Sequence, residues 1–406
     1  MNSVRFYTMM PLLFVLLVIT TGCWDRQEMN DRAIILGWGM DLNEDGSYTA
    51  TANIVVPMNT KSGGAQGGNN EYMLQTARGR SVIDAAQNIQ KKMSRVLFAS
   101  HRRNIFLGES LAKRGIGHIV DEYARNPELR LRTNIFVVKG GTAQQAMSLS
   151  NQLEKNPSVA VLKIQEKIGA PVGRSLLDFF IMSNAYGGSV MPVLQIVSPL
   201  GESQKKNEND SPPTPTLEAA GSAIFDRSLK LTGYLGYNEY WARLWIVNKL
   251  RNRDLIAQMD GPESTVAVRA RNFKSKVTPV INTHPIRLNV VLSAQGQIPE
   301  NNTGLDLSIP ENIKKVETRL NLQLQRQIEH IVTKVQDEFQ TDIFDLGDII
   351  HRKYPQQWKK MAGDWNTLFR AADISVKVNV KVDGAGLTGK SLLPDVYKGE
   401  EQHADQ

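Results

Sequence analysis

The position of the only cysteine, Cys23, constrains this chain more than any other feature. A single cysteine forms no disulfide within the chain, so packing must stabilise the folded body. Cys23 follows a basic residue, Arg5, an apolar run over residues 12–19, and the small residues Thr21 and Gly22. This order is typical of a secretory signal peptide, and the apolar run is too short to span a bilayer.

A cysteine at this point predicts a lipoprotein. We expect cleavage between Gly22 and Cys23, removal of residues 1–22, and a covalent diacylglyceryl lipid on the Cys23 thiol, with no other cofactor. Two acyl chains anchor a protein stably, whereas one gives marginal binding. Trp24 would then lie at headgroup level, where indoles are favoured. The alternative is an ordinary signal peptide followed by a free, buried cysteine.

Composition predicts a multi-domain globular body. Without residues 1–22 the chain keeps 384 of its 406 residues, more than one hydrophobic core normally organises, so two to three domains are expected. Hydrophobic residues make up 41% and charged residues 22%, as in ordinary globular proteins. No second apolar run of membrane-spanning length follows Cys23, so we expect a soluble body on an N-terminal lipid anchor.

Basic side chains gather between residues 78 and 132. They include Arg78, Arg80, Lys91, Lys92, Arg95, Arg102, Arg103, Lys113, Arg114, Arg125, Arg130 and Arg132. A surface of this kind is attracted to anionic headgroups, by about 1 kcal/mol for each cation that reaches the membrane. The alternative is a solvated surface with ion pairs to Asp84, Glu109, Asp121, Glu122 and Glu128. Nucleic acid is not expected as a partner, because the chain carries a secretion signal and no recognition motif.

The first half of the mature chain predicts an α+β domain over residues 23–200. Two apolar strands with an Asp-Gly turn at residues 45–46 predict a β-hairpin over 33–57. Helical spacing of apolar residues starts at Ser81 and runs through Val96. The pattern then continues with a strand at 105–107, a helix at 116–123 and a strand at 132–138. Mixed helices and strands of this kind indicate the α+β class.

Residues 201–216 contain no large apolar side chain and predict an exposed linker or loop between domains. A second α+β region is expected over residues 217–395, followed by a polar tail at 396–406. It opens with strands over 220–235 and has further strand candidates over 265–294.

The longest predicted helix covers about residues 309–341. It begins at Ser308-Ile309-Pro310-Glu311, which matches a capping box with proline in the first turn. Its apolar stripe comprises Ile313, Val316, Leu320, Leu324, Ile328, Ile331, Val335 and Phe339. Alternation over residues 374–382 predicts a strand that can pack on this stripe. A coiled-coil partner for the helix is the alternative.

Motifs for catalysis and metal binding are weak. The six histidines show no ligand spacing, so no metal site is expected. Residues 108–112 lack the final glycine of a nucleophile elbow, and residues 63–68 lack the Lys-Ser/Thr of a phosphate loop. We therefore predict no catalytic residue and no enzymatic activity.

One exposed surface is a candidate for partner binding: His351, Arg352, Lys353 and Trp358. The basic pair would face acidic groups, and Trp358 and Trp365 would serve as aromatic anchors, which are enriched at interfaces. In the alternative, Pro355 ends a helix and the tryptophans fill the core.

Four stretches resemble one protein family. They are residues 23–31 with 37–41, residues 79–81 with 100–101, residues 127–133, and residues 347–358 with Trp365. The family is that of the C-subunit lipoproteins of bacterial spore germinant receptors, the Ger(x)C family. The last stretch is the most specific, because no general folding rule demands His-Arg-Lys-Tyr-Pro followed by two tryptophans. The chain departs from the family pattern at 239–243 and in the length of 201–216.

The resemblance implies a three-domain α+β protein, lipid-anchored on the outer face of the inner spore membrane. It implies two integral-membrane partner subunits, one related to amino-acid permeases, and no catalytic activity. The expected function is a non-enzymatic subunit of a nutrient germinant receptor, required for spore germination. The alternative is a solute-binding lipoprotein of a membrane transporter, which would need a pocket with convergent polar groups.

Overall fold

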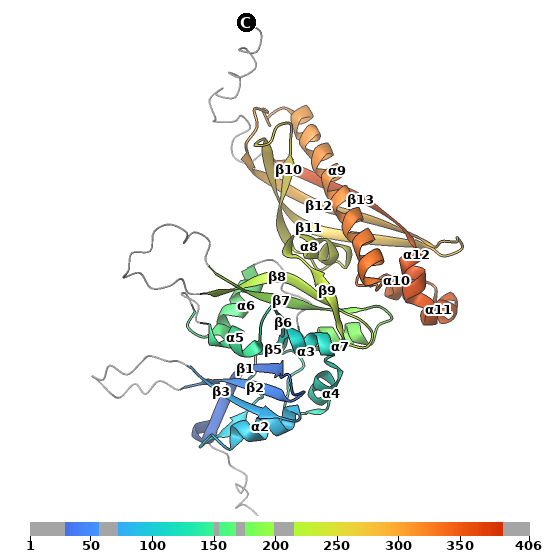
Figure 1. The fold of residues 1–406 in the computed structure, drawn as a ribbon. Helices are drawn as coiled ribbons and strands as arrows, with labels where there is room; N and C mark the ends of the chain where they lie inside the picture. The colour runs from blue at the N-terminus through green and yellow to red at the C-terminus, as the bar shows by residue number, and fades with distance from the viewer. Residues whose placement is uncertain (1–28, 57–71, 150–153, 168–174, 199–214, 385–406) are drawn as a thin grey trace, which may run out of the picture.

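The computed structural model describes residues 29–56, 72–149, 154–167, 175–198 and 215–384 (Figure 1). The described strands form two sheets, each packed against helices, which confirms the predicted α+β class with several domains. No helix within these ranges is long and apolar enough to cross a membrane. The predicted signal peptide, the lipid site at Cys23 and most of the 201–216 segment lie outside the described residues.

The first sheet contains nine of the described strands, with hydrogen-bonded order β3-β2-β1-β5-β6-β7-β8-β9 and with β4 beside the start of β1. The strands are β1 (Arg32–Leu42), β2 (Tyr48–Val55), β3 (Tyr72–Gly79), β4 (Val96–Phe98), β5 (Asn104–Gly108), β6 (Asn134–Lys139), β7 (Ser189–Val197), β8 (Thr216–Phe225) and β9 (Leu231–Leu235). Strands β1 and β2 form the predicted antiparallel hairpin.

Helices cover both faces of this sheet. Strands β1, β5, β6 and β7 run parallel, and the buried strands of a parallel sheet are apolar on both sides. On one face lie α2 (Val82–Gln90), α3 (Glu109–Arg114), α4 (Gly117–Arg125) and α7 (Leu176–Ser183), and on the other α5 (Ala143–Ser148) and α6 (Pro157–Lys167). Alternate residues of β5 show the division: Ile105 and Leu107 pack on the first set, Phe106 on the second.

Helix α2 is shorter than its sequence pattern predicted. Ser81 caps it by accepting a hydrogen bond from the Asp84 N–H, as helix-start chemistry favours. The helix ends at Gln90, and Val96 begins β4 rather than continuing the apolar stripe. Strand β4 pairs in parallel with residues 32–34 of β1, so strand pairing overrides the local helical spacing.

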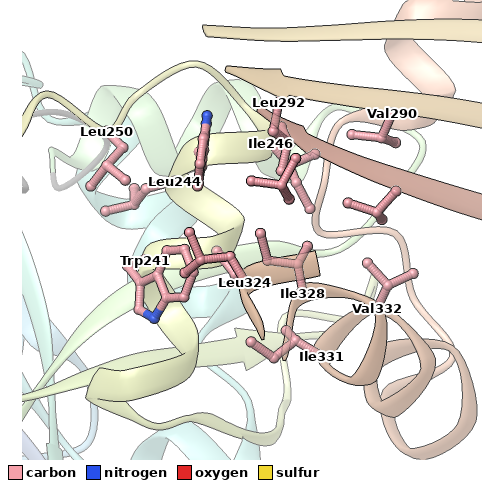
Figure 2. Close-up of a cluster of buried hydrophobic side chains, with 14 of the residues drawn as sticks. Trp241, Leu244, Ile246, Leu250, Val290, Leu292, Leu324, Ile328, Ile331 and Val332 are labelled. Carbon is pink, nitrogen blue, oxygen red and sulfur yellow. The ribbon is translucent and has the colours of Figure 1, made fainter. Parts of the chain in front are cut away.

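The second sheet has the order β10-β11-β12-β13 and is covered on one face by the long helix α9 (Pro310–Lys334) and a following π-helical turn, η2 (Val335–Phe339). Its strands are β10 (Asn252–Gln258), β11 (Thr265–Val280), β12 (Arg287–Asn301) and β13 (Asp373–Gly384). Figure 2 shows Trp241 and Ile246 of α8 (Tyr237–Ile246) beside Leu324 and Ile328 of α9, in the core between the helices and this sheet.

Helix α9 begins only in part as its sequence predicted. Pro310 occupies the first turn, as predicted. Ser308 does not form the predicted capping box, because its N–H and its hydroxyl both donate to Asp306, and Ile309 occupies the N-cap position.

The predicted strand over 374–382 is β13, and α9 packs on it directly. Asn321 accepts from the Val380 N–H at 2.7 Å and donates to its carbonyl at 3.2 Å, so α9 supplies partners to the edge strand. This favours the core-helix interpretation over a coiled coil.

Strand pairing continues across the predicted linker. Strand β8 pairs antiparallel with β7, and β9 pairs with β8. The change from the first sheet to the second therefore comes at α8, after the 201–216 segment.

Leucines on opposite sides of α9 provide a stability test. Leu320 is 0% exposed, whereas Leu322 is 42% exposed. Leu320→Ala leaves a cavity in the core and is expected to lower the free energy of unfolding by about 2–5 kcal/mol. Leu322→Ala, the matched control, should change it by no more than about 0.5 kcal/mol. Urea unfolding of both variants measures this, and equal effects would contradict the packing of α9 on its sheet.

Candidate partner-binding surface

The residues predicted for partner binding lie on short helices after α9. These are α10 (Leu346–Lys353), α11 (Pro355–Met361), the 3-10 turn η3 (Ala362–Asp364) and α12 (Trp365–Ala371). Figure 1 places α10, α11 and α12 at the lower end of α9, opposite the end beside β10. Helix α10 ends at Lys353 and Pro355 opens α11, which confirms that Pro355 stops the first helix.

Both tryptophans of this region are core residues. Trp358 is 1% exposed and Trp365 is 0% exposed, and their rings meet edge-on with centroids 5.2 Å apart. Trp358 therefore does not belong to the exposed surface on which it was placed as an anchor. The large apolar indole gains more from burial under α10 than from contact with water.

The other three predicted residues are exposed on the last turn of α10. We name the exposed basic residues His351, Arg352, Lys353, Lys359 and Lys360 the α10–α11 basic surface. Cations at a helix C-terminus interact favourably with the helix dipole. The His351 ring stacks on Trp358 at 6.0 Å, and Lys353 lies 5.3 Å from the centroid of the Tyr354 ring. The buried aromatic cluster thus fixes the backbone that presents these charges.

A buried carboxylate, Asp342, organises the region beneath this surface. It accepts hydrogen bonds from the Phe344 and Gly347 N–H groups, both at 2.8 Å, and from the Trp365 indole at 3.0 Å. Burial raises the pKa of Asp342 to about 6, because loss of hydration outweighs the three donors. Only glycine fits at position 347 without a shift of its neighbours, because a Cβ there would lie 2.7 Å from Trp365 Nε1.

The same region holds the two halves of the chain together. The Gly188 N–H donates to the Asp342 carbonyl at 3.0 Å, and Tyr186 meets the Trp358 ring edge-on at 4.9 Å. Arg243 is 1% exposed and donates through Nε to the Ile343 carbonyl at 2.7 Å. Segments before β7, within α8 and after α9 therefore contact one another at one junction.

The sequence left two roles open for the basic residues between 78 and 132: attraction to anionic headgroups, or a solvated surface with ion pairs. The structure supports each role in part. Eleven of the twelve are exposed, but Arg102 is buried. Three make ion pairs on the surface: Arg80 with Asp84, Lys113 with Glu109, and Arg125 with Asp121. Such exposed pairs contribute little to stability, so most of this charge remains available to a partner.

The part of the chain that the structure describes contains no group of three or more His, Cys, Asp or Glu residues placed to hold a metal ion.

Comparison with known proteins gives matches over both halves. A family model described as "Spore germination protein N-terminal domain" matches residues 25–199, and one described as "Spore germination B3/GerAC like, C-terminal" matches residues 220–386. The predicted linker lies between the two matches. These findings confirm the family resemblance drawn from the sequence.

Individual relatives extend over nearly the whole chain. Spore germination protein KC of Bacillus subtilis (strain 168) is 27% identical, with 94% of this chain and 96% of the relative covered. Spore germination protein B3 of the same organism is 23% identical, with 93% and 98% covered. The crystal structure of the GerBC protein aligns with a TM-score of 0.54 at 19% identity, covering 86% of this chain and 97% of that one, and so has a similar fold.

The raised pKa of Asp342 predicts how stability depends on pH. An acid whose pKa rises from 3.8 to about 6 on folding binds more protons in the folded state between these values. The free energy of unfolding therefore falls as pH rises from about 4 to 6, by at most about 3 kcal/mol from this group. Asp342→Asn should remove that slope, and should destabilise the protein at pH 7 because an amide NH₂ would face the N–H donors.

Urea unfolding at several pH values measures the slope. Asp364→Asn, which changes an exposed carboxylate in η3, is the control and should keep it. An unchanged slope in Asp342→Asn would contradict this role of burial.

Proposed function

The chain belongs to the GerAC-like family of spore germination proteins, and on this premise we propose that it is a non-enzymatic, lipid-anchored subunit of a nutrient germinant receptor. The observation that carries the proposal is the pair of family matches, over residues 25–199 and 220–386. The subunit would act on the outer face of the inner spore membrane, assembled with two integral-membrane subunits, one of them permease-like.

The position of the first described residues supports a membrane-facing end. Only residues 24–28 separate Cys23 from Met29, where the short turn η1 (Met29–Asp31) begins. At roughly 3.5 Å per residue, this segment spans on the order of 20 Å at most. Strand β1 then pairs with β4, and the exposed cations Lys91, Lys92 and Arg95 directly precede β4. A lipid on Cys23 would therefore keep these cations near anionic headgroups.

Membrane tethering also favours assembly. A protein confined to the membrane plane meets its membrane partners at a high effective concentration without additional contacts. The α10–α11 basic surface is the proposed contact with acidic groups of those partners, because it is exposed while its supporting aromatic residues are buried. Charge complementarity of this kind sets orientation and association rate.

Replacement of the lipid-bearing cysteine tests the anchored-receptor proposal. Spores that carry Cys23→Ala should lose both membrane retention of the protein and the response to nutrient, because no acyl chain can be attached. Their response to a non-nutrient trigger should be normal. Membrane fractionation and germination assays of mutant and wild-type spores measure this, and a retained nutrient response in the unanchored mutant would contradict the need for a tether.

Charge reversal tests the partner surface. Arg352→Glu should leave folding intact, since the side chain is exposed, but should lower co-purification with the membrane subunits at least several-fold. Arg326→Glu, at an exposed position of α9, is the matched control and should not affect assembly. Normal co-purification of the Arg352→Glu protein would exclude this surface as a contact.

A further inference from the structure

A cavity of about 300 Å³ lies in the first domain, outside the surface described above. Residues from α2, α4, β1 and β4 and from the segments beside them line it. The apolar lining consists of Ile35, Trp38, Val82, Ile83, Ala86, Leu97, Ala99 and Leu129. Its size is at the lower end of the range for small-molecule sites, so only a small ligand would fit.

The cavity contains a buried cation that forms no ion pair with a described residue, although Glu122 lies near enough to attract it. Arg102 is 6% exposed, and within the described part of the chain neither its Nε nor its Nη2 has a hydrogen-bond partner. Its guanidinium carbon lies 4.9 Å from the centroid of the Tyr123 ring, which fixes its position. Arginine remains charged in proteins, and an unpaired buried charge is costly. The arrangement therefore points to an anion that completes the site.

Glu122 does not supply that anion. It lines the same cavity, but it forms no ion pair with Arg102 in the described structure. One of its oxygens accepts from Asn126 at 3.4 Å, and the other, Oε2, has no partner among the described residues. Burial raises the pKa of Glu122, and the nearby Arg102 guanidinium lowers it in part, so the two side chains attract each other without forming a hydrogen bond.

We propose that this cavity binds a small monocarboxylate with an apolar body. The Nε and Nη2 groups of Arg102 form the side of a guanidinium that binds a carboxylate through two parallel hydrogen bonds. The apolar walls would contact the remainder of the molecule. A dianion such as phosphate is disfavoured more strongly than a monoanion, because the acidic residues Glu122 and Glu128 line the same cavity. This inference is independent of the proposed receptor function.

Titration calorimetry of the full chain in detergent, with hexanoate and its neutral analogue hexanamide, tests the proposal. Hexanoate should bind saturably at one site, and hexanamide at least tenfold more weakly. Arg102→Gln should weaken hexanoate binding at least tenfold. Arg103→Gln changes an exposed neighbour and should leave it unchanged.

A second variant keeps the test decisive if Arg102→Gln does not fold. Ile83 lines the cavity and is 56% exposed, so Ile83→Glu should fold and place a carboxylate at the opening. It should weaken hexanoate binding at least threefold more than hexanamide binding, because the added carboxylate repels only the anion. The proposal is overturned if hexanoate does not bind saturably, if both compounds bind equally, or if a folded Arg102→Gln protein binds hexanoate as the wild type does.

Discussion

Three N–H groups converge on the carboxylate of Asp342, and the arrangement of the C-terminal helices depends on this contact. It holds the turn before α10 against Trp365. The carbonyl of the same residue accepts from Gly188, in the segment that leads into β7. One residue thus links the start of a strand in the first sheet to the helices that follow α9. The chain has no internal disulfide. Buried polar contacts of this kind therefore specify how the two sheets are arranged, which apolar packing alone would specify less well.

Polar side-chain contacts also stabilise the edge of the second sheet. An edge strand presents unpaired backbone groups, and β13 is an edge strand of its sheet. Polar side chains of α9 meet several of these groups: Asn321 bonds both backbone groups of Val380, and Glu317 accepts from the Val382 N–H at 2.8 Å. The long helix therefore contributes its apolar stripe to the core and its polar border to the edge.

Local patterns were sufficient to predict much of the fold. The hairpin of β1 and β2, the helix α9 and the alternating strand β13 each follow from spacing within one segment. The end of α2 could not be predicted from local spacing, because the pairing of β4 with β1 determines where the helix stops.

The sites depend on distant contacts and were predicted less well. Exposure of His351, Arg352 and Lys353 agrees with the predicted surface, but Trp358 is buried against Tyr186, more than 150 residues earlier in the chain. Arg102 was one of twelve similar basic residues, and only the packing of α2 and α4 around it distinguishes it from the others. The role of Asp342 was also not predicted: Phe344 and Gly347 are near neighbours in the sequence, but its third donor, Trp365, lies 23 residues later.

The pairing of β7 with β8 has a consequence for how the protein can be divided. The two family matches separate at residues 200–219, yet Ala223 and Phe225 of β8 belong to the core of the first domain. A fragment that stops at residue 199 would leave β7 as an open edge with buried apolar residues newly exposed, which favours association between chains. The smallest unit with a closed first core therefore extends to Leu235, at the end of β9.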